Sequence, residues 1–143
     1  MSTKTLKLKI VTPERMILEE EVEQVTLPTT EGEITVLPGH VPLIASLGTG
    51  EIVAKHIGEG EVSPMSVSGG FVEVKSGSEI IILASTAEPV AQIDIERAKK
   101  RAEELMKMKN ESDVDFEHFE AELERSLNRV KIADKWRSKK YRK

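Results

Sequence analysis

Four arginines in the second half of the chain have a spacing that suits the binding of an anion. Arg97 and Arg101 are four residues apart, and so are Arg125 and Arg129. In an α-helix this spacing puts both members of a pair on one face. Guanidinium groups suit phosphate oxygens because several N–H donors engage at once. The four residues therefore predict a site for a phosphate-bearing ligand, provided that both segments are helical and lie side by side.

An ordinary helix explains part of the same pattern. Asp94 is a good N-cap residue, and Arg97 can pair with it three residues later. The second arginine pair can likewise bind Glu122 and Glu124 on its own helix, or an acidic segment of another protein. From the spacing alone these alternatives stay open.

The sequence offers little for catalysis or for metal binding. The histidines His40, His56 and His118 are not at metal-ligand spacing, and there is no cysteine. The phosphate-loop and nucleophile-elbow motifs are absent from the sequence as well. We therefore predict no catalytic residue, no metal site and a protein that is not itself an enzyme.

The elements that must hold the arginines change type near residue 90. Before it, short segments of alternating apolar residues are separated by glycine and proline, as is typical of a β-sandwich. After it, the apolar residues follow the helical period. We expect a β-sandwich domain over residues 1–88 and a two-helix domain with a basic tail over residues 89–143. An antiparallel helical hairpin brings the start of one helix near the end of the other, and with them the two arginine pairs.

Charge and apolar residues both indicate that the helices need a partner surface. Residues 1–90 hold six Lys and Arg against thirteen Asp and Glu, whereas residues 91–143 hold fifteen against twelve. The basic part favours an acidic surface, a phosphate-bearing ligand or water alone, and for residues 139–143 we expect a solvated tail. A hairpin alone cannot bury both apolar stripes fully, so it must lie on the sandwich or on another protein. The first expected stripe is Ile95, Ala98, Ala102, Leu105 and Met106, and the second is Phe116, Phe119, Leu123, Leu127, Val130 and Ala133.

Three motifs occur in order along nearly the whole chain. They are LPGHVPL at residues 37–43, SGGFVEV at residues 68–74 and IDIERA at residues 93–98. Together they resemble the epsilon subunit of the bacterial F1Fo ATP synthase. The resemblance implies a sandwich of about ten strands followed by an α-helical hairpin. It also implies a non-catalytic subunit of the central stalk in a rotary motor that couples hydrogen ion transport to ATP synthesis.

The resemblance further implies the partners of each domain. The sandwich would bind the gamma subunit and rest on the ring of c subunits, with Glu31, Gly32 and His40 touching that ring. The helices would reach the α and β subunits of F1 and inhibit ATP hydrolysis. Membrane association would come only through the complex, at the cytoplasmic face of a bacterial cell membrane or, alternatively, the stromal side of a chloroplast thylakoid. No nucleic acid partner is implied.

Some relatives hold the hairpin down by binding ATP without hydrolysing it, so ATP is expected as a regulatory ligand and no cofactor is required. By this resemblance the adenine end is assigned to Glu88, Ile93, Asp94 and Ala98. The phosphates and the salt bridges around them are assigned to Arg97, Arg101, Arg125 and Arg129. A stalk subunit without ATP sensing and a free β-sandwich adaptor are the alternatives.

Overall fold

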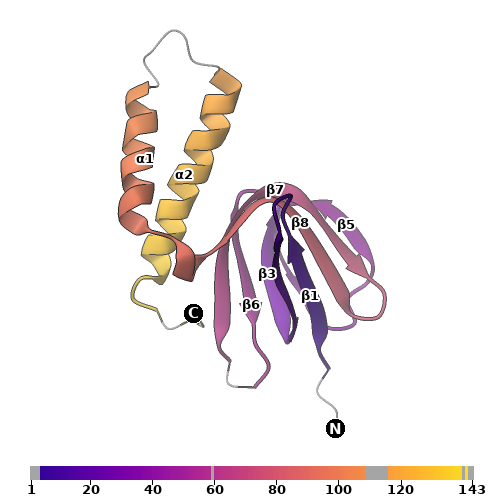
Figure 1. Ribbon diagram of the computed structural model, residues 1–143. Coiled ribbons are helices and arrows are strands. Elements are labelled where there is room, and N and C mark those ends of the chain that lie inside the picture. Colours follow the sequence, from indigo (N-terminus) through magenta and orange to yellow (C-terminus); the bar gives the residue numbers. More distant parts are fainter. Residues whose placement is uncertain (1–3, 59, 109–115, 140, 142–143) are drawn as a thin grey trace.

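The computed structural model describes residues 4–58, 60–108, 116–139 and 141. It confirms a β-sandwich followed by two helices, with the helices at one side of the sandwich and β5 at the opposite side (Figure 1). The helices are α1 (Ile95–Met108) and α2 (Phe116–Trp136), preceded by the short 3-10 helix η1 (Val90–Gln92). The strands are β1 (Leu6–Val11), β2 (Met16–Val22), β3 (Gln24–Thr29), β4 (Gly32–Val36), β5 (Leu43–Ser46), β6 (Gly50–Lys55), β7 (Val62–Lys75) and β8 (Glu79–Pro89).

The strands follow the order β2-β1-β8-β7-β6-β3-β4, with β5 paired to β7 outside this path. All pairs of strands are antiparallel except β1 with β8, which are parallel. The described residues hold eight strands rather than about ten. The number is lower because β7, with 14 residues, pairs with β6 along its first half and with β5 along its second.

Two glycines allow β7 to change partners. Gly69 and Gly70 have φ angles of 69° and 118°, which favour glycine, and they lie between the segments that pair with β6 and with β5. At Gly70 a Cβ atom would lie 2.0 Å from the carbonyl oxygen of Leu83 on β8. Only glycine fits this close approach of two backbones.

The sandwich has an aliphatic core, because alternate residues of each strand point inward. Leu6, Leu8 and Ile10 of β1 are fully buried, as are Ile80 and Ile82 of β8. A second cluster lies where the helices meet the sandwich. It consists of Val90, Ile93, Ala98, Ile132, Ala133 and Trp136, with Val53 and Val62 of the sandwich packed against it.

The predicted helical stripes are confirmed in part. On α1, Ala98, Ala102 and Leu105 are buried, but Met106 is 57% exposed. On α2, Phe119 and Ala133 are buried, Leu127 is 45% exposed, and Ser126 is buried at 5%. The stripe on α2 differs because this helix packs against both α1 and the sandwich strands β6 and β7. It therefore turns a polar residue toward the sandwich. The side chain of Phe116 lies outside the described residues.

Candidate functional site

A polar pocket of about 560 Å³ lies between the helices and the sandwich. The helices line it with Arg101, Glu122, Arg125, Ser126, Asn128 and Arg129. The end of β8 and η1 contribute Ala87, Glu88 and Gln92, and the rest of the sandwich contributes Arg15, Ser66, Ser68 and Thr86. Both domains thus build one site, and it brings together four of the eight residues assigned to ATP by resemblance: Glu88, Arg101, Arg125 and Arg129.

Two of the pocket arginines are held by carboxylates. Arg129 donates from Nε to Oε2 of Glu88 at 2.7 Å and from Nη2 to Oε1 at 3.2 Å. Arg101 on α1 is bound to Glu122 on α2, with Nε 3.0 Å from Oε1, and its Nη1 lies 3.5 Å from Glu104. The hydrogen bond to Glu122 raises the pKa of Arg101 above its ordinary value. These pairs fix two guanidinium groups at the wall of the pocket.

The other two pocket arginines face no carboxylate among the residues that the structure describes. Neither Arg15 nor Arg125 forms an ion pair there. The alternative in which the arginines of α2 pair with Glu122 and Glu124 is not observed in the described residues. Four guanidinium groups stand against the two carboxylates that line the pocket, so its electrostatic potential favours an anion.

The other four residues assigned to ATP lie outside the lining of this pocket. Ile93 and Ala98 are buried in the second apolar cluster. Asp94 caps α1: its Oδ1 accepts a hydrogen bond from the backbone N–H of Arg97 at 3.2 Å, as its role at a helix start predicts. The side chain of Arg97 is exposed. Their assignment to the adenine end and to the phosphates stays a prediction.

Polar contacts attach α2 to the sandwich at two places, between the pocket arginines and at the end of the helix. The Asn128 side chain donates to the Gly50 carbonyl at 3.0 Å and to Ser66 Oγ at 3.2 Å. At the C-terminal end of α2, Glu51 on β6 accepts a hydrogen bond from Trp136 Nε1 at 2.8 Å and also binds Lys135. The helices are therefore docked on the sandwich by specific contacts.

Two family models match almost the entire chain. The β-sandwich domain of the ATP synthase delta/epsilon chain matches residues 5–90, and the long alpha-helix domain of the same family matches residues 92–134. The chain belongs to the ATP synthase delta/epsilon chain family. It is accordingly a subunit of ATP synthase and not an enzyme in its own right.

Individual relatives of this delta/epsilon chain agree with the family models. The ATP synthase epsilon chain of Desulforamulus reducens is 42% identical over 134 residues, which cover 92% of this chain and 98% of the relative. The epsilon chain of Dehalococcoides mccartyi is 46% identical over 135 residues, covering 92% and 94%. Among solved structures, a chain of the Euglena gracilis mitochondrial ATP synthase (OSCP/F1/c-ring) is similar to this chain with a TM-score of 0.73 and 27% identity. The match covers 91% of this chain and 81% of the Euglena chain.

The residues assigned to the c-ring lie at two separate loops of this delta/epsilon chain. Glu31 and Gly32 are exposed at the turn between β3 and β4, where Thr30 N–H donates to the Ser46 carbonyl at 3.1 Å. His40 is half-buried in the loop before β5, where the Gly39 N–H donates to Ser78 Oγ at 2.8 Å. The two loops therefore lie at opposite ends of β5. Their contact with a c-ring stays a prediction.

None of the helices in the described part of this delta/epsilon chain is long and apolar enough to cross a bilayer. Its described side chains form no group of three or more His, Cys, Asp or Glu that could hold a metal ion.

Sequence reasoning missed the sandwich side of the pocket. Arg15 lies 82 residues before Arg97 in the chain, in a short turn with no motif of its own. Its place depends on the parallel pairing of β1 with β8, which carries the turn after β1 toward the end of β8. The only local signal was a lone basic residue among acidic ones, which does not indicate a ligand.

Proposed function

We propose that this chain is an epsilon-type, non-catalytic subunit of the ATP synthase central stalk, and that it binds ATP as a regulatory ligand between its two domains. The observation that carries the ATP part is the pocket shared by Arg101, Arg125 and Arg129 of the helices and by the sandwich. Relatives named ATP synthase epsilon chain match over almost the full chain, which supports the stalk part.

The size and chemistry of the pocket suit phosphate groups. Its volume of about 560 Å³ lies within the range of roughly 300–1,000 Å³ that is usual for small-molecule sites. Guanidinium groups bind phosphates through several charge-assisted hydrogen bonds. Arg125 has no carboxylate partner among the described residues, so an incoming phosphate competes with no existing ion pair at this position.

The ligand would act on the position of the helices. Because both domains line the pocket, ATP binds the docked arrangement more tightly and stabilises it against undocking. Ligand at a hundred times its Kd contributes about 2.7 kcal/mol to that state. Loss of ATP would release the hairpin, which would then reach the α and β subunits and inhibit ATP hydrolysis.

An ATP titration of the isolated protein tests the regulatory site. We expect backbone amide signals of residues 86–101 and 122–129 to shift with millimolar ATP, and Arg125→Gln to abolish most of the shift. Lys131→Gln is the matched control, because Lys131 is an exposed cation on the same helix that does not line the pocket. Unchanged spectra at millimolar ATP would reject the nucleotide site and leave a stalk subunit without ATP sensing.

The inhibitory role needs the assembled enzyme. Deleting residues 91–143 removes both helices, while the sandwich keeps its own aliphatic core. We expect the complex to assemble and its ATPase activity to rise several-fold. Equal ATPase activity of the two complexes would rule out inhibition by the hairpin.

An apolar face of the sandwich supports the proposed binding of the gamma subunit. Ile44, Phe71 and Leu83, from β5, β7 and β8, are 73%, 60% and 52% exposed and line one shallow pocket of about 230 Å³. Side chains of this kind in one contiguous area are typical of protein interfaces. This face belongs to the side of the sandwich that carries β5, away from the helices (Figure 1).

The apolar face can be tested by co-purification with the gamma subunit. We expect Phe71→Asp to prevent capture of gamma, while Lys75→Gln at the end of the same strand leaves it intact. If wild-type protein failed to capture gamma, the alternative of a free sandwich adaptor would gain support.

With gamma and the c-ring as partners, the subunit would lie peripherally at the cytoplasmic face of the membrane through the complex.

A further inference from the structure

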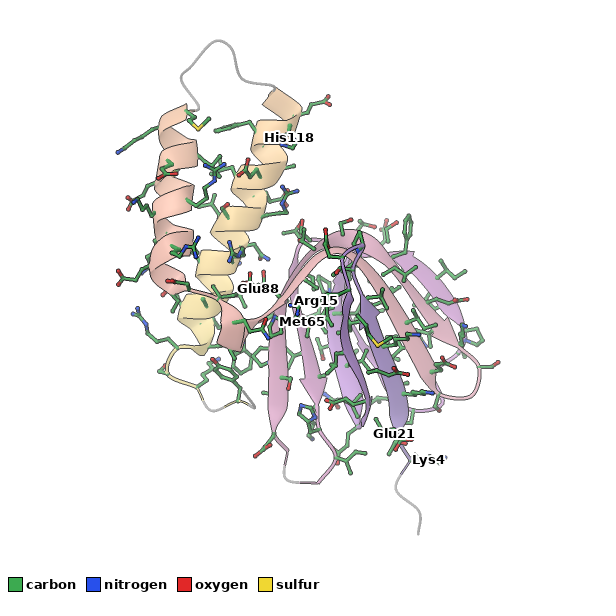
Figure 2. All side chains as sticks on the ribbon, viewed as in Figure 1. Lys4, Arg15, Glu21, Met65, Glu88 and His118 are labelled. Atoms are coloured by element: carbon green, nitrogen blue, oxygen red, sulfur yellow. The ribbon has the colours of Figure 1, made fainter. Side chains whose placement is uncertain are left out.

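One cation in the pocket belongs to neither helix. Arg15 follows β1 in the turn that leads to β2, and it lines the pocket together with Ser66, Ser68 and Thr86. Figure 2 places Arg15 close to Glu88, where the helices meet the sandwich. The pocket wall opposite the helices therefore carries a guanidinium and three hydroxyl groups, all of which can bind phosphate oxygens.

The turn holds Arg15 in a fixed position. Thr12, which is only 7% exposed, donates from Oγ1 to the Arg15 carbonyl at 3.1 Å and accepts from the Arg15 N–H at 3.3 Å. The Thr12 N–H also donates to the same carbonyl at 2.9 Å. The backbone at Arg15 is thus closed by three hydrogen bonds, whereas its side chain forms no ion pair among the described residues.

A bland explanation is that Arg15 is simply a solvated surface residue. Its location argues for more, because its guanidinium lies in a pocket that already has an excess of positive charge. Like charges in one pocket repel one another unless an anion is bound between them. Arg15 and Arg125 come from opposite walls, so a chain of phosphates is a ligand that satisfies both.

We propose that Arg15 is a binding residue for the phosphate chain of the nucleotide, and that it makes the nucleotide a bridge between the sandwich and the helices. This rests on the proposed function of the pocket. Arg97, Arg101, Arg125 and Arg129 all belong to the hairpin, so they can bind phosphate whether or not the hairpin is docked. Arg15 can join them only in the docked state, and it therefore converts binding energy into docking.

Calorimetric titration of the full chain with ATP and with ADP tests the contact. We expect Arg15→Gln to weaken ATP binding about tenfold, the loss of one charge-assisted contact, and Arg15→Lys to lose less. Lys75→Gln, which removes the same charge from the far end of β7, should bind ATP like the wild type. Equal ATP affinity of Arg15→Gln and the wild type would overturn the role of Arg15 while leaving the ATP site intact. A wild-type protein that binds no ATP would overturn both.

A second readout separates a bridge from a distant charge effect. Trp136 is the only tryptophan and is 8% exposed in the docked state, so acrylamide quenching of its fluorescence reports undocking. In low urea, saturating ATP should reduce quenching of the wild type more than of Arg15→Gln. If saturating ATP protected Trp136 equally in both proteins, other groups of the sandwich wall would couple the nucleotide to docking, and the bridge through Arg15 would be rejected.

Discussion

The contact between Glu51 and the end of α2 gives the sharpest test of how the hairpin is held on the sandwich. Glu51 is 16% exposed and accepts one hydrogen bond from the indole N–H of Trp136 at 2.8 Å. A hydrogen bond to a charged group contributes about 1.5–3 kcal/mol. Lys135 is 45% exposed, so its ion pair with the same carboxylate adds at most about 1 kcal/mol. We expect Glu51→Ala to weaken docking by about 2 kcal/mol, or roughly 30-fold.

Urea titration followed by Trp136 fluorescence measures this loss. The midpoint of the fluorescence change should fall in Glu51→Ala with an unchanged slope, because stability changes and the exposed surface does not. Amide hydrogen exchange of β1 and β8 should stay at the wild-type level, since this carboxylate contacts only the helix end. Glu51→Gln keeps a neutral acceptor, so its urea midpoint should lie between those of the wild type and Glu51→Ala.

A matched substitution guards against a general effect of losing a carboxylate. Glu33 on β4 is exposed and forms no ion pair among the described residues, so Glu33→Ala should leave the midpoint unchanged. Trp136→Phe keeps an aromatic ring but loses the N–H donor. Because this variant has no tryptophan, its undocking is followed by hydrogen exchange of α2 instead of fluorescence. Equal undocking midpoints for Glu51→Ala and Glu33→Ala would refute this reasoning. So would an equal effect of Glu51→Ala on the hydrogen exchange of α2 in the wild-type and Trp136→Phe backgrounds.

Three other substitutions test the interior and the docking surface. Gly70→Ala should lower the stability in thermal unfolding by more than about 3 kcal/mol or prevent folding. Gly77 has a φ of 87° and open space where a Cβ would lie, so Gly77→Ala should cost only about 1 kcal/mol. Leu105→Ala, at a position 1% exposed, should cost the hairpin about 2–4 kcal/mol by circular dichroism, whereas Met106→Ala should cost under about 1 kcal/mol. Asn128→Ala removes donors to Gly50 and Ser66 and should speed hydrogen exchange in α2 by about tenfold; no change would show that packing alone holds the helix there.

Sequence patterns predicted the local features of this fold well. Glycine marks a break between strands as expected at Gly77, which has a positive φ in the turn that connects β7 and β8. Ala98, Ala102 and Leu105 are buried because the helical period fixes which residues share a face. These features depend on neighbours a few residues away, which a sequence shows directly.

Features that depend on contacts between distant segments were harder to predict. Leu127 was expected in the core, yet α2 turns Ser126 inward because the polar wall of the pocket lies on that side. The described residues hold eight strands where the resemblance implied about ten, and β7 continues through Gly69 and Gly70 as one long strand. Three of the four predicted arginines line the helical side of the pocket, whereas Arg15 on the sandwich side could be found only once the pairing of the strands was known.

The magnitudes of these contacts explain how a small ligand could decide the position of the helices. Undocking α2 breaks the contacts of Asn128, Arg129 and Glu51 at once, so their contributions act together and docking is cooperative. Each is worth about 1–3 kcal/mol before the conformational entropy of ordering the helices is subtracted. A nucleotide at a hundred times its Kd adds about 2.7 kcal/mol, as much as one of these contacts. A ligand contribution of that size changes the position of the helices only where the net free energy of docking is of similar magnitude, which the urea titrations above measure.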